Sequence, residues 1–520
     1  MGTRGRFSWR VLRGATVTVG WVLLVQGAAA EPYTPVEIPT LGGAATFPRD
    51  MNNAGQVVGK GHTSEGDYHA FIWDETYGIL DLGTLGGESS SASAINELGH
   101  VAGNSETESG DTHAFLWDPF NGMRDLGSLG GDSWASAIND CGQVAGTSWN
   151  DAGRLRVFLW DDANGMQDIG TLGGDSAKLW GDGAYGPLSN AGSIVGSSRT
   201  MTGVPESIAF LWDPVDGMHN LGTLGGESSY ACAVNDAGQV CGVARLASGQ
   251  RHAFVWDCVN GMQDLGTFGD GDYSEADDIN GAGEVLGEAH TCHDTHPFVW
   301  DSVNGMRDLG TLGGWAGAAY AMNSSGQVVG DSEVGSPDSY VYHAFLWDPA
   351  NPSGILDLND LVDQAPWELE RAELLNDHGD IVGTTQLPAA YVTFFLKNAR
   401  VAFRLDTEGE GSTDPPKGEH NIGQGTRLLV RALPAPGWQF DHWNGHLSGL
   451  PNPAEVILTT DMSCQAVFVQ QTGTQCGGWQ KGAPLPRWGS SSVADLVLLA
   501  LVGASLLLAG HVSRARPRPH

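Results

Sequence analysis

The stretch DLGTLGGESSSASAINELGHVAGNSETESGDTHAFLWDPFNGMR, residues 81–124, decides the fold because the chain repeats it. Each copy of L-G-T-L-G-G is followed by an N-x-x-G turn, a short apolar run, a polar loop and H-A-F-L-W-D or a relative. The Trp-Asp pairs begin at Trp73, Trp117, Trp160, Trp212, Trp256, Trp300 and Trp347. A period of about 44 residues indicates repeated supersecondary units that bury their apolar faces only against one another.

Each unit contains four short apolar runs separated by Gly, Asn and Asp, which is typical of strands rather than helices. Four strands per unit of this length predict an all-β fold, a β-propeller. The eighth unit lacks the fourth run, G-M-x-D-L-G, and Val36-Glu37-Ile38 is expected to supply it. We therefore expect eight four-stranded blades, or seven if the weak last unit is not a blade.

The remaining segments divide by composition. Arg4, Arg6, Arg10 and Arg13 precede an apolar stretch and Ala28-Ala29-Ala30, which is the pattern of a signal peptide. An apolar segment before a basic tail predicts a membrane-spanning helix that leaves the propeller outside the cell. The expected divisions are a signal peptide (1–30), the propeller (31–399), a small all-β domain (400–470), a linker (471–492), the membrane helix (493–512) and a basic cytoplasmic tail (513–520).

The charge of the chain bears on its partners. There are 61 Asp and Glu residues against 26 Lys and Arg residues, a net charge of −35. Binding to nucleic acid rests on a basic surface, so this class of partner is excluded. A glycan, a cell-surface protein and the membrane itself remain the expected partners.

The recurring H-A-F-L-W-D and D-L-G-T-L-G-G blocks resemble the HAF-repeat family of bacterial extracellular proteins over roughly residues 36–398. That resemblance implies an exported repeat protein without an assigned activity. The segment GTRLLVRALPAPGWQFDHWNG, followed by LPNPAEVILTTDMSCQAVF, is similar to a bacterial surface repeat domain of the divergent internalin B-repeat type, a spacer or adhesive module. The tail resembles a C-terminal sorting segment.

The loops of a propeller divide between two faces, and one face is more variable here. The N-x-x-G and W-D turns share a face and are uniform, whereas the L-G-T-L-G-G crossovers and the loops before H-A-F share the other and vary in length. The fourth unit carries an insertion after its crossover, K-L-W-G-D-G-A-Y-G at 178–186. Trp180 and Tyr185 are therefore candidate aromatic platforms for a sugar or peptide.

The segment H-T-C-H-D-T-H holds the densest group of metal-ligating residue types: His290, Cys292, His293, Asp294 and His296. A divalent ion such as zinc accepts these types at such spacing, although His296 occupies the histidine position of the repeat. No other cofactor is predicted. No motif of a hydrolase, metalloprotease, P-loop or dinucleotide-binding enzyme occurs, and residues repeated in every blade favour a structural role over a catalytic one.

The seven cysteines of an exported chain suggest disulfides. In A-C-A-V-N-D-A-G-Q-V-C a symmetric hairpin turn would place Cys232 opposite Cys241, close enough to bridge.

The favoured function is a membrane-anchored cell-surface propeller that binds a partner or glycan, and the alternative is a propeller-type hydrolase or lyase with its site on the variable face. A structural surface component without a ligand is the third hypothesis.

Overall fold

The computed structural model describes residues 33–470 except 181–185, 202–206, 270, 292–293, 336–340, 350, 352–353, 363–365, 389, 399, 424–426 and 458–461. The expected signal peptide, linker, membrane helix and basic tail lie outside the described residues. Within them, no helix is long and apolar enough to cross a membrane. The helical element in this part of the chain is one 3-10 turn, η1 (Leu358–Asp360).

The described strands of residues 34–397 form eight antiparallel sheets of four strands each. Their order within a sheet follows the sequence from the centre outward. The first four blades are β2 (Gly42–Met51), β3 (Val57–Thr63), β4 (Tyr68–Asp74) and β5 (Gly78–Asp81); β6 (Gly86–Ile95), β7 (Val101–Thr107), β8 (Thr112–Asp118) and β9 (Gly122–Asp125); β10 (Gly130–Ile138), β11 (Val144–Asn150), β12 (Leu155–Asp161) and β13 (Gly165–Asp168); and β14 (Gly173–Lys178), β15 (Ile194–Thr200), β16 (Ser207–Asp213) and β17 (Gly217–Gly222).

The next three blades repeat this arrangement, and the eighth differs in its outermost strand. These blades are β18 (Gly225–Val234), β19 (Val240–Leu246), β20 (Arg251–Asp257) and β21 (Gly261–Gly266); β22 (Ser274–Ile279), β23 (Val285–His290), β24 (Thr295–Asp301) and β25 (Gly305–Asp308); β26 (Gly313–Met322), β27 (Val328–Val334), β28 (Tyr342–Trp347) and β29 (Leu356–Asp357); and β30 (Arg371–Leu375), β31 (Ile381–Leu387), β32 (Ala390–Lys397) and β1 (Thr34–Ile38).

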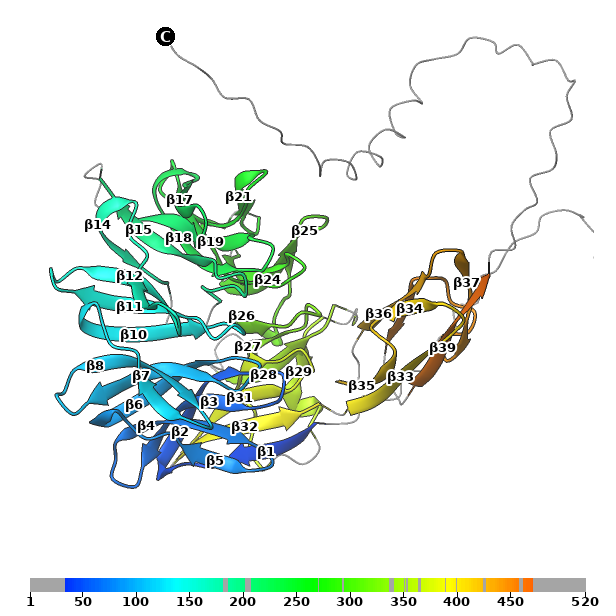
Figure 1. Ribbon diagram of the computed structural model, residues 1–520, viewed down its shortest axis with the longest axis horizontal. Coiled ribbons are helices and arrows are strands. Elements are labelled where there is room, and N and C mark those ends of the chain that lie inside the picture. The colour runs from blue at the N-terminus through cyan, green and yellow to red at the C-terminus, as the bar shows by residue number, and fades with distance from the viewer. Residues whose placement is uncertain are drawn as a thin grey trace, which may run out of the picture. The chain divides into compact units, whose positions relative to one another are not determined.

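The ring closes through β1, which comes from the opposite end of the propeller sequence. It pairs antiparallel with β32, with Val36 opposite Phe395 and Ile38 opposite Thr393, and Figure 1 shows the blue β1 beside the yellow β32. The prediction that Val36-Glu37-Ile38 completes the eighth blade is confirmed. Closure matters because an open three-stranded blade would leave unpaired backbone groups on β32.

Hydrophobic clusters fill all eight junctions between neighbouring blades. At the junction of the eighth and first blades, Ile38 and Phe395 pack with Phe71 and Trp73. The phenylalanine of each H-A-F motif is fully buried in such a cluster. It fits because the glycine of the neighbouring strand leaves room: a Cβ on Gly103 would lie 2.6 Å from the Phe115 ring. The recurring glycine of the second strand therefore makes room for the recurring phenylalanine of the third strand.

The asparagines of the N-x-x-G turns join the blades into a second ring around the channel. In seven blades this Asn donates from Nδ2 to the backbone oxygen of the equivalent residue in the next blade. The bonds are Asn52 to Asn96 (3.1 Å), Asn96 to Asn139 (3.0 Å), Asn139 to Ser189 (3.1 Å), Asn235 to Asn280 (3.0 Å), Asn280 to Asn323 (3.4 Å), Asn323 to Asn376 (3.1 Å) and Asn376 to Asn52 (3.3 Å). Ser189, which has no amide, is the single break. The turns thus hold the blades together as well as reversing the chain.

The innermost strands carry a β-bulge near the middle in seven blades. The unpaired residues are Arg49, Ser93, Ser136, Cys232, Asp277, Tyr320 and Glu373. In the fourth blade, pairing stops at Lys178 and resumes at Leu188. A bulge bends a strand and re-aims a side chain, and four of these residues, Arg49, Ser136, Tyr320 and Glu373, line the central cavity.

Residues 400–470 form two further sheets that share no strand with the blades. Their order is β35-β33-β39-β37 and β34-β36-β38. The strands are β33 (Arg400–Glu408), β34 (Gly411–Asp414), β35 (Gly418–Gly423), β36 (Arg427–Pro434), β37 (Trp438–Gly445), β38 (Ala454–Ile457) and β39 (Met462–Gln470). Phe403, Val430, Trp443 and Phe468 form its core, and the indole of Trp443 donates to the Pro451 oxygen at 3.1 Å.

Candidate functional site

Because strands alternate in direction, the propeller has two chemically different faces. The turn face carries the N-x-x-G and W-D turns, and the crossover face carries the L-G-T-L-G-G crossovers and the loops between second and third strands. At the turn face, a recess of about 350 Å³ is lined by the uniform ring of turn residues. Larger spaces lie inside the channel and toward the crossover face.

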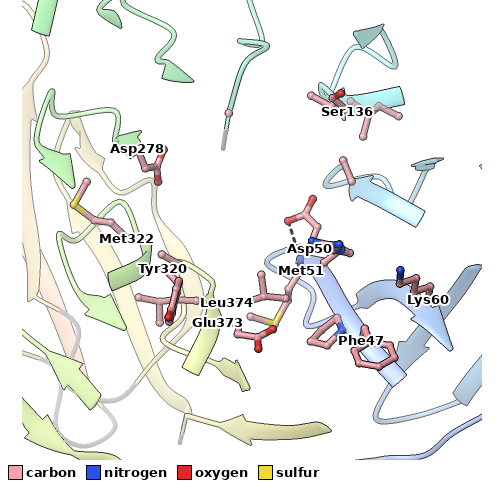
Figure 2. Close-up of a pocket in the computed structure, with 18 of the residues that line it drawn as sticks. Phe47, Asp50, Met51, Lys60, Ser136, Asp278, Tyr320, Met322, Glu373 and Leu374 are labelled. Atoms are coloured by element: carbon pink, nitrogen blue, oxygen red, sulfur yellow. Dashed lines mark hydrogen bonds between the residues drawn. The ribbon is translucent and has the colours of Figure 1, made fainter. Parts of the chain in front are cut away.

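The central cavity has a volume of about 690 Å³ and is lined by innermost strands from around the ring. Four bulge residues, Arg49, Ser136, Tyr320 and Glu373, contribute to its wall. Figure 2 shows Tyr320, Glu373 and Met51 around the same space, and each comes from a different innermost strand. The bulges therefore deliver four chemically distinct side chains to one place.

A second space, the mouth cavity, has a volume of about 860 Å³ and lies at the crossover end of the sixth, seventh, eighth and first blades. It shares Phe47, Tyr320, Arg371 and Glu373 with the central cavity. Its carboxylates are Glu288, Asp331, Glu368, Glu370 and Glu373, and its aromatic residues are Phe47, Tyr320, Tyr342 and Tyr391. Aromatic rings beside hydrogen-bonding carboxylates are the typical composition of a site for a polar ligand with apolar faces.

One wall of the mouth cavity is fixed by a network between the seventh and eighth blades. Asp331 accepts hydrogen bonds from the Tyr320 hydroxyl at 3.0 Å and from the Arg371 Nε at 2.8 Å. The Arg371 guanidinium also lies 5.0 Å from the centre of the Tyr320 ring. Arg371 is thus neutralised by Asp331 and oriented by Tyr320, which holds both side chains in place before any ligand arrives.

The other carboxylates of this wall have altered acidity. Burial, together with the negative charges of Glu275 and Asp331, raises the pKa of Glu288 to about 7. Burial also raises the pKa of Glu373, whereas the hydrogen bond from the Thr384 hydroxyl (2.6 Å) opposes that shift. A carboxyl group that titrates near neutral pH in a cavity can hold or transfer a proton.

Aromatic rings also line the mouth cavity and the adjoining part of the central cavity. The Phe47 ring lies 5.9 Å from Tyr391 and 6.2 Å from Tyr68 between ring centres. The Lys60 ammonium lies 4.7 Å from the centre of the Tyr68 ring. Tyr342 and Tyr391 are 38% and 42% exposed, so their rings are accessible to a ligand at the rim.

Part of the insertion in the fourth unit, residues 181–185, lies outside the described residues. On either side of it, the innermost strand pairs with β15 at Lys178 and again at Leu188. The half-buried Trp180 ring lies 4.6 Å from Tyr230, with the Lys178 ammonium 4.9 Å from the Trp180 ring centre. Trp180 is therefore part of a packed stack at the junction with the fifth blade. Tyr185 lies outside the described residues.

The described residues of the segment H-T-C-H-D-T-H, 290–296, bond to different partners rather than to one common point. His296 bonds through Nδ1 to Asp308 at 3.0 Å and through Nε2 to the Trp315 oxygen at 3.0 Å, and the bond to Asp308 raises its pKa. Both ring nitrogens are therefore engaged. His290 Nδ1 lies 3.1 Å from Asp272, the exposed Asp294 accepts a bond from Thr295, and Cys292 and His293 lie outside the described residues.

The bond from His296 to Asp308 recurs at each H-A-F histidine, where the third strand is tied to the outermost one. The pairs are His69 with Asp81, His113 with Asp125, His252 with Asp264, His296 with Asp308 and His343 with Asp357. Because the same bond recurs in five blades, we infer that this histidine has a structural role.

Among the described residues, Asp213, Asp216 and His219 form one group with metal-ligand geometry. They occupy the W-D turn of the fourth blade, where Asp213 accepts the backbone N–H groups of Val215 and Asp216. Asp118 makes the same two turn bonds in the second blade. The group is therefore a variant of the repeat turn.

The prediction that Cys232 lies opposite Cys241 is wrong. Cys241 pairs with Ala233, and Cys232 is the unpaired bulge residue. The turn closes between Asn235 and Gln239, so that Val234 lies opposite Val240 and the register is moved by one residue from that of a symmetric turn. Both cysteines are buried free thiols.

Sequence reasoning missed the residues of the mouth cavity because they lie in strands rather than in loops. The missed residues are Phe47, Glu288, Tyr320, Asp331, Arg371 and Glu373. A signal was present: the residue after the buried glycine of the second strand is Lys60, Asn104, Thr147, Ser197, Val243, Glu288, Asp331 or Thr384, whereas its neighbours repeat. Departures from a repeat consensus inside a strand mark the variable lining.

No family model and no curated protein matches the sequence. Among solved structures, the chain is similar to the β-propeller domain of the Trilobed protease from Pyrococcus furiosus, with 11% identity over 65% of this chain and 99% of that one and a TM-score of 0.40. It is also similar to the Pyrococcus horikoshii acylaminoacyl peptidase, with 12% identity over 74% of this chain and 64% of that one and a TM-score of 0.39. A third similar structure is a puromycin-hydrolyzing peptidase of Mycobacterium tuberculosis. The identity is 14% over 73% of this chain and 65% of that one, and the TM-score is 0.37. The match spans less than two thirds of each peptidase. The assignment of the propeller rests on strand order and blade junctions.

Proposed function

We propose that the protein is an exported, membrane-anchored propeller of the HAF-repeat kind that binds a glycan in the mouth cavity at the cell surface. The observation that carries this proposal is the lining of that cavity, where exposed tyrosines at the rim stand beside carboxylates from three blades. Ring faces accept the apolar faces of a sugar, and carboxylates accept its hydroxyl groups. The signal peptide and membrane segment expected from the sequence would present this face outside the cell.

The wall around Tyr320, Asp331 and Arg371 supports binding because its side chains are already held by mutual bonds. A ligand that enters a preorganised wall does not have to order these side chains, and less of its binding energy is lost. The proposal therefore predicts saturable binding by the free protein without a cofactor.

Replacing both rim tyrosines, Tyr342→Ala and Tyr391→Ala, is expected to weaken binding by at least about tenfold, since each ring contact contributes on the order of 1 kcal/mol. The measurement is a screen of the purified full-length chain on a glycan array, followed by titration of the best glycan. The control is Tyr77→Ala on the turn face, where the side chain is 89% exposed. Unchanged binding in the double variant, or binding to a cell-surface protein alone, would contradict the proposal.

Glycoside hydrolysis or lyase chemistry in the same cavity is a second candidate, favoured by Glu288. A general acid must be protonated near the working pH, and the raised pKa of Glu288, about 7, meets this requirement. Glu373, on a different blade, supplies a further carboxylate in the same wall.

If the protein cleaves the glycan that it binds, Glu288→Gln should lower kcat by about 100-fold or more with little change in binding. Turnover should also decline as the pH rises through about 7, because Glu288 then loses its proton. Product formation measured from pH 5 to 9 checks both statements, with the exposed Glu65→Gln as control. Turnover that is equal in wild type and Glu288→Gln excludes Glu288 as the acid.

A further inference from the structure

A concentration of positive charge stands out on this acidic chain, at the crossover ends of the third and fourth blades. A pocket of about 390 Å³, the cationic pocket, is lined by Arg154, Lys178 and Arg199 but by a single carboxylate, Asp175. The two guanidinium groups outnumber the single carboxylate, in a chain whose net charge is −35. A positive recess in a negative surface concentrates field on a small region and selects anions there.

The two arginines are held side by side by the carboxylate between them. Arg154 Nη1 pairs with Asp175 Oδ2, and Arg199 Nη1 lies 3.3 Å from Asp175 Oδ1. Each guanidinium uses one nitrogen for this contact and remains about half exposed, at 49% and 51%. Asp175 therefore orients both groups and leaves further N–H donors directed to solvent, where an oxyanion can accept from two donors at once.

Lys178 and the adjoining residues complete the pocket. The Lys178 ammonium lies against the Trp180 and Tyr230 rings, 4.9 Å and 6.0 Å from their centres, so its position is restricted by packing. Trp149, which is 40% exposed, lines the same pocket and provides a flat apolar surface. A ligand that satisfies both features carries an oxyanion next to a ring of mixed polarity.

We propose that the cationic pocket binds an acidic sugar residue, with its carboxylate or sulfate on Arg154 and Arg199 and its ring on Trp149. The inference rests on the proposed glycan-binding function for the kind of ligand, but its site is separate from the mouth cavity. It assigns an anionic rather than a neutral sugar to this second site. Uronates and sulfated sugars both carry an oxyanion, and the experiment tests an example of each class separately.

The experiment titrates the full-length protein with an oligogalacturonate, a heparin-derived oligosaccharide and a neutral malto-oligosaccharide of the same length. Binding of at least one acidic oligosaccharide is expected, with an affinity that falls as salt rises. Arg154→Ala combined with Arg199→Ala should weaken it by about 10- to 100-fold, since each charge-assisted contact is worth roughly a factor of ten. Trp149→Ala should weaken it less, and without changing the salt dependence.

The control is Arg124→Ala, which removes an equally exposed arginine that pairs with Asp162 near the turn face. Acidic-sugar binding that survives in the double variant, or is lost equally in Arg124→Ala, overturns the inference. Binding of the neutral oligosaccharide alone also overturns it while leaving the proposed function in place. Binding of none of the three, together with an empty glycan array, would overturn both.

Discussion

Ile38→Ala is expected to lower the free energy of unfolding by about 2–5 kcal/mol, the usual cost of truncating a buried isoleucine. Ile38 is 2% exposed and packs at the junction of the eighth and first blades with Phe71, Trp73 and Phe395. The loss should be large because this junction is the one at which the two ends of the propeller sequence meet. Equilibrium unfolding in urea, followed by tryptophan fluorescence, measures it.

Glu37→Ala is the matched control, because Glu37 lies on the same strand with an exposed side chain, and it should change stability by less than about 0.5 kcal/mol. Deletion of residues 34–38 is the stronger test. It exposes the edge of β32, and concentration-dependent association on a sizing column is expected. A deletion variant that remains monomeric and melts like the wild type would show that β1 does not close the ring.

Asn139→Ala is expected to destabilise the protein by about 3 kcal/mol or more, because it leaves several buried groups without partners. The Asn139 amide donates to the Ser189 oxygen and to Gln143 Oε1, and its Oδ1 accepts the N–H groups of Cys141 and Gln143. Its side chain is 4% exposed, so water does not replace these bonds. The midpoint of urea unfolding gives the measurement.

The chain offers its own control at the break in the ring. Ser189 occupies the equivalent position in the fourth blade, and its Oγ accepts one bond, from the Ser193 N–H at 3.2 Å. Ser189→Ala should therefore cost about 1 kcal/mol, and Ser189→Asn should stabilise the protein if the amide reaches the Asn235 oxygen. Equal costs for Asn139→Ala and Ser189→Ala would mean that the inter-blade bonds contribute nothing.

The repeat by itself determined the architecture. Turn, strand and packing signals recur at a fixed period, so one unit could be interpreted with the support of all the others, and the incomplete eighth unit pointed to Val36-Glu37-Ile38 as its missing strand. The W-D tryptophans were predicted to have structural roles, because a residue that recurs in every blade serves contacts that every blade makes. The H-A-F phenylalanines recur in the same way, and they are buried.

The position of the site was decided only by the tertiary structure. Phe47, Glu288 and Arg371 lie far apart in the sequence and meet because ring closure brings the first and last blades together. The turn between Asn235 and Gln239 placed Ala233 rather than Cys232 opposite Cys241. Bulges in other blades aimed Tyr320 and Glu373 into the channel. A repeat pattern encodes the contacts that all blades share, whereas a binding cavity is built from the positions at which the blades differ, and their convergence depends on the closed ring.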